Sequence, residues 1–356
     1  MTENSYYNLF KAFHFNDRLQ GITTGEAVAP VHIRIKPTNR CNQSCWFCAY
    51  RTDQLSLGEG MDEADSIPRE KMYEIVDDLI AIGVRAVTFS GGGEPLLYKP
   101  LPDVIRRLSE AGVKVGCLTN GSNLKGGMAD ALARHASWVR VSINGTDDEG
   151  YARARNVKIG DYSRILENMR AFADRETACV LGASLIIGAD DCEKVYDACS
   201  ALKRAGVRHV KLSAAVVGND AAENDAYHRK IFDRVQREAQ RAAGLADDGF
   251  GVINHYHLLG DRFAKPYAHC PSLSLLTVIG ADQCVYACQD KAYTAGGLLG
   301  SIKAMSFREF WFSEANRERL RAIDPRRDCR HHCAGHGKNM ALRGYLSVDP
   351  EHAAFI

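Results

Sequence analysis

The chain has 356 residues, 46% hydrophobic and 25% charged, and its 45 Lys and Arg against 44 Asp and Glu give a net charge of +1. This is the composition of a soluble protein with room for one large and one smaller domain. No basic block of the kind that follows a phosphate backbone is present, so we expect no nucleic-acid partner. Residues 1–20 lack the apolar run of a signal peptide or membrane helix, which predicts a cytoplasmic protein that does not bind membranes.

Short apolar runs alternate with amphipathic stretches through the first two thirds of the chain. This alternation predicts an α/β fold, a partial (β/α)6 barrel of parallel strands. The expected strands fall at 31–35, 84–90, 113–119, 138–143, 178–187 and 207–213, and the expected helices include 67–83, 101–112 and 191–206, each ending at a glycine. In such a sheet, reactive groups gather in the loops that follow the strands.

The alternation fades after about residue 220. A helix is expected at 226–244, two strands within 273–290 and another helix at 307–323. The chain is therefore predicted to have three parts. They are an extension at 1–30, the barrel at 31–220, and a linker helix with a small α+β domain at 221–356.

Three of the twelve cysteines, Cys41, Cys45 and Cys48, follow the first strand at C-x3-C-x2-C spacing. Without a secretory signal, metal binding or reactive thiols are favoured over disulfides. Thiolates suit zinc or iron–sulfur clusters, and four is the usual complement for either. Three thiolates leave one position to fill, either by a distant residue in a zinc site or by a ligand on one open iron of a 4Fe–4S cluster.

With Phe47 just before its third cysteine, the loop resembles that of the radical S-adenosylmethionine (SAM) enzymes, and the resemblance extends over residues 31–213. It implies that three cysteines bind a 4Fe–4S cluster and that SAM chelates the fourth iron. It also implies reductive cleavage of SAM to methionine and a 5′-deoxyadenosyl radical, which takes hydrogen from a substrate C–H bond. A reductant such as flavodoxin or ferredoxin is then an expected partner.

Segments after later strands are similar to the SAM-binding segments of that family. The run "SGGGEP" resembles the segment that receives the amino group of SAM, and two positions after the fourth strand match contacts to its carboxylate and ribose. An arginine further on resembles the one that pairs with the carboxylate, and 182–191 resembles the segment that packs on adenine. The implied contacts are Gly91, Gly92, Gly93, Glu94, Ser142, Asn144 and Arg155. Asn144 stands where aspartate is frequent, and a glycine-rich turn with a solvated glutamate is the alternative for the first segment.

A second set of cysteines, Cys270, Cys288, Cys329 and Cys333, resembles the C-terminal extension called SPASM, or its one-cluster form, the twitch domain. Four thiolates can enclose a complete auxiliary 4Fe–4S cluster with no open iron. The family has a glycine five residues before the second cysteine, where this chain has Gln283. The alternative is a zinc site made by Cys329, Cys333 and a nearby histidine.

Three residues beside this set are candidates for catalysis. Cys284 is a thiol that returns hydrogen to a substrate radical, a replacement cluster ligand, or a packing residue. Asp290 and Lys291 follow Cys288 directly and are either an acid/base pair near the substrate or a surface salt bridge.

Three functions are compatible with these residues. The favoured one is oxidation or epimerisation of a carbohydrate-like small metabolite, and the alternative is modification of a ribosomally made peptide. The 30 residues before the first strand are too few for the leader-binding domain common in peptide-modifying enzymes, which favours the small molecule. A non-catalytic iron–sulfur electron carrier is the third, and it leaves the Glu94 segment unexplained.

Overall fold

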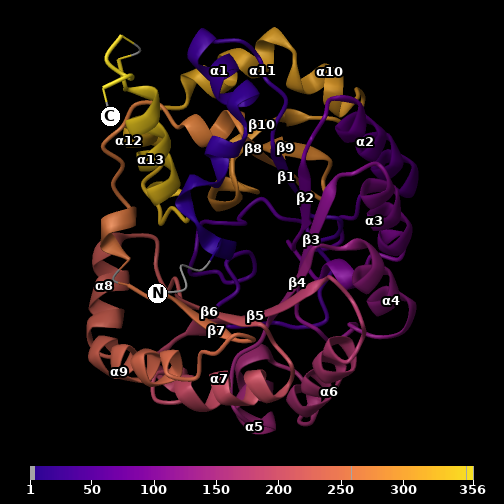
Figure 1. Cartoon of the computed structure of the whole chain (residues 1–356), viewed down its shortest axis with the longest axis vertical. Helices are drawn as coiled ribbons and strands as arrows, with labels where there is room; N and C mark the ends of the chain where they lie inside the picture. The colour runs from indigo at the N-terminus through magenta and orange to yellow at the C-terminus, as the bar shows by residue number, and fades with distance from the viewer. Residues whose placement is uncertain (1–4, 258, 350, 356) are drawn as a thin grey trace.

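A computed structural model describes residues 5–257, 259–349 and 351–355. Within them the strands form one sheet in the order β10-β9-β8-β1-β2-β3-β4-β5-β6-β7. The parallel strands of its main part are β1 (His32–Ile35), β2 (Ala86–Phe89), β3 (Lys114–Thr119), β4 (Trp138–Ser142), β5 (Val180–Ile187), β6 (His209–Ala214) and β7 (Gly251–His255). The sheet curves into an open arc, as the α/β partial-barrel prediction requires (Figure 1).

All six expected strands are present within a few residues of their predicted bounds. β7, which pairs in parallel with β6, was not predicted, because it lies where the alternation in the sequence has faded. On β1 the side chains of Ile33 and Ile35 are fully buried, whereas those of His32 and Arg34, which alternate with them, are only partly buried. This period of two separates an apolar outer face, packed on helices, from a polar inner face.

Helices cover the outer face of the arc (Figure 1). They are α2 (Arg69–Ala81), α3 (Leu101–Glu110), α4 (Gly126–His135), α5 (Asp148–Arg155), α6 (Asp161–Ala173) and α7 (Val195–Arg204). Gly83, Gly112 and Gly206, which follow three of them, have φ angles of 77°, 83° and 80°. The predicted glycine stops are thus left-handed helix ends, which a residue with a Cβ adopts only at a cost.

The C-terminal region continues the same sheet. β8 (Leu276–Ile279) pairs in parallel with β1, and β9 (Cys284–Tyr286) and β10 (Leu298–Ser301) extend the edge in antiparallel pairs. The helix predicted at 226–244 is two helices, α8 (Ala221–Arg229) and α9 (Phe232–Ala243). The one predicted at 307–323 is also divided, into α10 (Phe307–Trp311) and α11 (Glu314–Ala322), because the Ser313 side chain caps a new N-terminus by accepting from the Asn316 amide.

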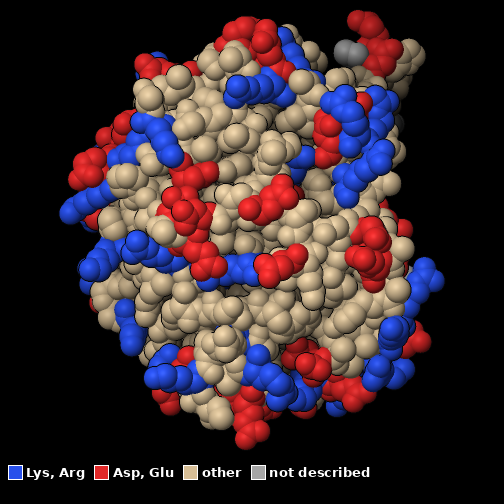
Figure 2. Space-filling model, turned by 180° about the vertical axis from the view of Figure 1, so that it is seen from behind, with Lys and Arg blue, Asp and Glu red and all other residues tan. Residues whose placement is uncertain are grey.

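The remaining helices are α1 (Asn16–Thr24), α12 (Pro325–Asp328) and α13 (His336–Leu346). Short 3-10 helices lie at Ser5–Tyr7, Leu9–His14, Pro95–Leu97, Ala189–Asp191, Gly260–Arg262, Pro271–Ser274, Gln289–Lys291 and Ala295–Gly297. The N-terminal segment lies on the inner side of the arc, where the Arg140 guanidinium donates to the Tyr7 hydroxyl over 2.6 Å (Figure 1). None of the helices in the described part of the chain is long and apolar enough to span a membrane. Figure 2 shows Lys and Arg interspersed with Asp and Glu on the opposite face.

Candidate active site

The three-cysteine loop follows β1 and is anchored to the end of α5. The Ser44 and Trp46 amides donate to the carbonyls of Arg155 and Ala154 over 3.0 and 3.2 Å, and the Cys48 amide turns back to the Cys45 carbonyl over 3.1 Å. The loop therefore lies at the C-terminal edge of the parallel strands, where the sequence placed it.

The glycine run after β2 packs directly on the cysteine loop. The Gly93 amide donates to the Thr38 carbonyl over 3.1 Å, and the Glu94 amide to the Arg40 carbonyl over 2.8 Å. A Cβ on Gly93 would lie 2.0 Å from the Arg40 carbonyl oxygen, and one on Gly92 would lie 2.0 Å from the Asn39 side chain. Contact between the two loops thus accounts for these glycines, whereas the sequence suggested only close approach to a ligand.

Glu94 is buried, with 2% of its surface exposed, so the alternative of a solvated glutamate is wrong. Its Oε1 accepts from the Leu96 amide over 3.0 Å and the Thr119 hydroxyl over 2.6 Å, and its Oε2 accepts from the Asn120 amide over 2.7 Å. Burial raises the pKa of Glu94, and these hydrogen bonds oppose that rise. A carboxylate oxygen has two lone pairs, so Oε2 retains one acceptor position.

Arg155 joins three segments that the sequence separates. Its guanidinium donates to Gln43 Oε1 over 2.9 Å, to Ser142 Oγ over 3.1 Å and to Asn144 Oδ1 over 2.9 Å. The structure therefore brings together Ser142, Asn144 and Arg155, as predicted. It also adds Gln43, which the sequence analysis did not select, although the residue lies between two of the clustered cysteines.

The surroundings of Arg155 fit an anionic cofactor. The residue is 2% exposed, its Nε lacks a hydrogen-bond partner, and no carboxylate pairs with it within the described ranges. Burial raises the pKa of the Cys45 thiol, and the Arg155 charge opposes this rise. A buried cation beside three cysteines is stabilised when thiolates or a ligand carboxylate supply negative charge.

No three His, Cys, Asp or Glu side chains in the described part of the chain are arranged to hold a single metal ion. A 4Fe–4S cluster has a different requirement, because each thiolate binds its own iron.

The structure brings the second set of cysteines together from three segments, the last of which carries both Cys329 and Cys333. Burial, with smaller effects from the charges of Cys333 and Cys329, raises the pKa of Cys270 to about 12. The pKa of the Cys288 thiol is also raised, by burial and by charges that include those of Cys270 and Cys333. Lys265 Nζ holds the last segment by donating to the Cys329 carbonyl over 3.0 Å. The four thiols are thus near enough for their charges to interact.

Cys284 lies apart from these four. It begins β9 opposite Ser301, whereas Cys288 follows the other end of that strand, and burial and the Asp282 charge raise the pKa of Cys284 to about 11. The neighbouring Gln283 has a φ of 61°, the left-handed region that glycine favours. Gln283 stands where the family pattern has a glycine, and its backbone has the conformation that a glycine favours.

The side chains of Asp290 and Lys291 bind different partners. They therefore do not form the surface salt bridge that the sequence left open. Asp290 accepts from the Ala334 amide over 2.8 Å, and its charge acts on Arg34 and Lys36. Lys291 Nζ instead donates to the Asp328 carbonyl over 2.6 Å. Asp290 alone is directed toward the inner face of the sheet.

The remaining cysteines are packing residues in the core. Cys117, Cys179, Cys192 and Cys199 are all buried. Cys192 precedes α7, because the helix predicted at 191–206 begins only at Val195.

Lys36, at the end of β1, was missed by the sequence analysis. Its Nζ donates to the Gly91 carbonyl over 2.7 Å and lies 3.9 Å from the centre of the Tyr50 ring. The Tyr50 hydroxyl donates to the Gln289 carbonyl over 3.1 Å, beside Cys288. A lysine directly after an apolar strand was the available signal, because such a residue enters the strand-end site.

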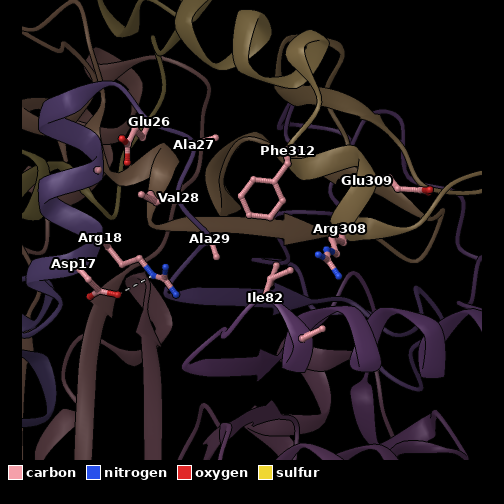
Figure 3. Close-up of a pocket in the computed structure, with 12 residues that line it drawn as sticks. Asp17, Arg18, Glu26, Ala27, Val28, Ala29, Ile82, Arg308, Glu309 and Phe312 are labelled. Atoms are coloured by element: carbon pink, nitrogen blue, oxygen red, sulfur yellow. Dashed lines mark ion pairs between the residues drawn. The ribbon is translucent and has the colours of Figure 1, made fainter.

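A cavity of about 700 Å³ lies between α1, α2 and α10, beside the segment that leads into β1 (Figure 3). It is lined by residues such as Arg18, Ile82 and Phe312, and none of the predicted site residues borders it. Arg18 there pairs with Asp17 over 3.6 Å (Figure 3). The cavity is therefore separate from the candidate active site.

Residues 35–199 match the sequence model of the radical SAM superfamily. With three cysteines after β1 and the parallel sheet, this match shows that the chain contains a radical SAM domain. The superfamily binds a 4Fe–4S cluster and SAM, and the residues around Arg155 fit both.

Particular relatives match only part of the chain. An S-adenosylmethionine-dependent nucleotide dehydratase of Lacinutrix mariniflava is 32% identical over 120 residues, 34% of this chain and 24% of that protein. A probable GTP 3′,8-cyclase of Sulfolobus acidocaldarius is 32% identical over 143 residues, 38% of this chain and 41% of that protein. The chain thus spans less than half the length of these relatives.

Two solved structures share the fold over nearly the whole chain. Streptococcus suis SuiB bound to S-adenosylmethionine has a TM-score of 0.61 at 13% identity, covering 90% of this chain and 75% of SuiB. The enzyme anSMEcpe with bound AdoMet has a TM-score of 0.57 at 14% identity, covering 89% of this chain and 96% of that chain.

Proposed function

We propose that this protein holds a 4Fe–4S cluster through Cys41, Cys45 and Cys48 and oxidises a small hydroxylated metabolite after reductive cleavage of SAM. When bound, the cluster and SAM supply the 5′-deoxyadenosyl radical that removes a hydrogen atom from the substrate. The observation that carries the proposal is the buried Arg155 guanidinium, which ties Ser142 and Asn144 to the cysteine loop.

Residues from several segments beside the cysteine loop would hold SAM. The Arg155 cation would pair with its carboxylate, and Ser142 and Asn144 would contribute polar contacts. The free acceptor position on Glu94 Oε2 would receive its ammonium group. Supporting this arrangement, Gly93 and Glu94 are fixed by backbone hydrogen bonds to the same loop.

A second 4Fe–4S cluster is proposed on Cys270, Cys288, Cys329 and Cys333. The mutual effect of their charges and the anchoring of the last segment by Lys265 support this ligand set. Four thiolates leave no open iron, so this cluster would transfer electrons without binding SAM.

Oxidation is favoured over epimerisation by the position of two side chains. Asp290, whose charge acts on Arg34 and Lys36 of the inner face, would accept the proton released when a carbinol carbon is oxidised, and a cluster held by the second cysteine set would supply the electron acceptor. Cys284, the thiol proposed to return hydrogen in an epimerisation, lies apart from both cysteine sets. The names of the relatives add a ribose-containing metabolite as a specific form of the carbohydrate-like substrate.

The test is release of 5′-deoxyadenosine by anaerobically reconstituted protein given SAM and dithionite. We expect release from the wild type and from Cys199→Ala, a buried cysteine outside both sets, and none from Cys41→Ala. Release no greater than that of Cys41→Ala would overturn the proposal. Adding candidate sugars, nucleotides or peptides and following their consumption then separates small-molecule oxidation from peptide modification.

A further inference from the structure

Three cations lie on the inner face of the sheet. They are Arg34 on β1, Arg140 on β4 and Lys211 on β6, and each alternates with fully buried residues that face the helices. Because successive strand side chains point to opposite faces, the three cations share the concave side. The burial pattern therefore shows that the inner face of the sheet carries charged side chains, whereas the outer face is apolar.

Aromatic rings lie at the opposite end of this inner face from the cysteines. Trp138 and His209 are near the starts of β4 and β6, and their rings occupy the space beside Gly116 and Gly182, where a Cβ would lie 2.2 and 2.4 Å from them. Tyr7 of the N-terminal segment packs edge-on against His209 at 5.7 Å between ring centres. The cations thus lie between these aromatic rings and the cysteine loop.

These cations lack acidic partners. Within the described ranges, none of the three forms an ion pair with a carboxylate, and the Nε atoms of Arg34 and Arg140 are buried without a hydrogen-bond acceptor. Among the described residues, the Arg140 guanidinium donates to the Tyr7 hydroxyl and not to a carboxylate. Burial, with smaller effects from the charges of Arg140 and Arg34, lowers the pKa of Lys211 to about 8. Clustered like charges of this kind are costly unless an anion offsets them.

Their position connects the inner face to both cysteine sets. The charge of Arg34 interacts with those of Arg140, Asp290 and Cys288, and the neighbouring Lys36 interacts with Cys48 of the first set. A molecule held by these cations would therefore extend toward the region between the two cysteine sets, where the proposed function places the substrate.

We propose that Arg34, Arg140 and Lys211 bind an oxyanionic group of the substrate, a phosphate ester or a carboxylate. The inference rests on the proposed function, because it assigns the part of the substrate that lies away from the reacting carbon. Guanidinium groups match the two oxygens of a phosphate or carboxylate through paired N–H donors, and the lysine adds a compact positive charge. A neutral sugar would leave the cations uncompensated.

The test is calorimetric titration of the full-length, anaerobically reconstituted protein with inorganic pyrophosphate and, separately, with succinate. We expect saturable binding that is about tenfold or more weaker in Arg34→Gln and in Lys211→Gln, equivalent to about 1.4 kcal/mol or more. Arg237→Gln, an exposed arginine on α9, is the matched control and should bind as the wild type does. Tighter binding of pyrophosphate assigns a phosphorylated substrate, and tighter binding of succinate assigns a carboxylate.

Folding of each variant is checked by its thermal transition. Arg34→Lys, which keeps the charge, should bind more tightly than Arg34→Gln and provides a second comparison if the glutamine variant does not fold. The proposal is overturned if the wild type binds neither anion, or if the inner-face variants bind as tightly as Arg237→Gln.

Failure of this inference is distinguishable from failure of the proposed function. Release of 5′-deoxyadenosine without substrate depends on the cysteine loop and SAM, and anion binding depends on the inner face. Anion binding without SAM cleavage would support the anion site and reject the proposed oxidation. SAM cleavage without anion binding would reject the anion site and leave the proposed oxidation standing.

Discussion

Arg155 shows how one side chain can organise the site. Buried charge is costly, and a guanidinium that donates to Gln43, Ser142 and Asn144 while keeping its Nε unpaired lacks a neutralising partner among the described residues. The proposed carboxylate of SAM removes that imbalance. The strength of SAM binding is therefore the property most sensitive to this residue.

Replacing Arg155 with glutamine should weaken SAM binding by about tenfold or more, because a charge-assisted hydrogen bond to a carboxylate is lost. Equilibrium dialysis of reconstituted protein against labelled SAM measures the dissociation constant. Arg153→Gln removes an exposed arginine from the same helix and should bind as the wild type does. Equal affinities in the two variants would show that Arg155 has no part in SAM binding.

The second cysteine set gives a prediction about iron content. Two 4Fe–4S clusters require about eight irons per chain, and loss of the auxiliary cluster leaves about four. Cys288→Ala should lower the iron content toward four, whereas Cys284→Ala should retain about eight. Colorimetric iron analysis after anaerobic reconstitution measures both. Loss of iron from Cys284→Ala would instead identify that residue as a ligand.

At the scale of the element, the loop after β2 and the cysteine loop act as one unit. Their backbones approach so closely that Gly93 has no room for a side chain, and the obstructing atom is a carbonyl oxygen of Arg40. A backbone atom cannot move aside as a flexible side chain does. The glycine run therefore fixes the position of the cysteines as well as that of Glu94.

Gly93→Ala should lower the free energy of unfolding by about 2 kcal/mol, the typical cost of forcing extra volume into a packed site. Gly127→Ala on α4 is the control, because no atom lies within 4 Å of its new Cβ, and its stability should be unchanged or slightly higher. Urea unfolding measures both values. A Gly93→Ala protein as stable as the control would contradict this account of the loop.

At the scale of the whole molecule, the sheet separates two environments. Helices cover its outer face (Figure 1). Strand alternation places histidines and cations on its inner face. Burial, with a smaller effect from the Arg140 charge, lowers the pKa of His209 to about 4. The unfolded chain, with a histidine pKa near 6.5, therefore binds more protons than the folded protein between pH 6.5 and 4.

This difference predicts that stability falls as the pH drops below about 6.5. His209 alone should lower the free energy of unfolding by about 1 kcal/mol between pH 7 and pH 5.5. The decrease should be smaller in His209→Gln and unchanged in His14→Gln, which alters an exposed histidine. Urea unfolding at the two pH values tests this, and an equal decrease in both variants would rule out burial of a neutral His209.

Local signals in the sequence predicted much of this protein. The alternating apolar runs determined the six parallel strands, the glycines marked the helix ends, and cysteine spacing after the first strand predicted the radical SAM family. Each of these features depends on a few neighbouring residues, so it can be read without knowing the fold. The two broken helices were missed because the amphipathic pattern continues past each break, and at the second break the Ser313 cap begins a new helix.

Only the tertiary structure decided which distant groups meet. Pairing of β8 with β1 places the segments that carry Cys270 and Cys288 beside the strand that leads to the cysteine loop, and Arg155 reaches Gln43 across 112 positions in the chain. Strand order also collects Arg34, Arg140 and Lys211 on one face, although each looks like an ordinary charged residue in its own segment. Such contacts depend on register and curvature, which are set by packing of the whole chain.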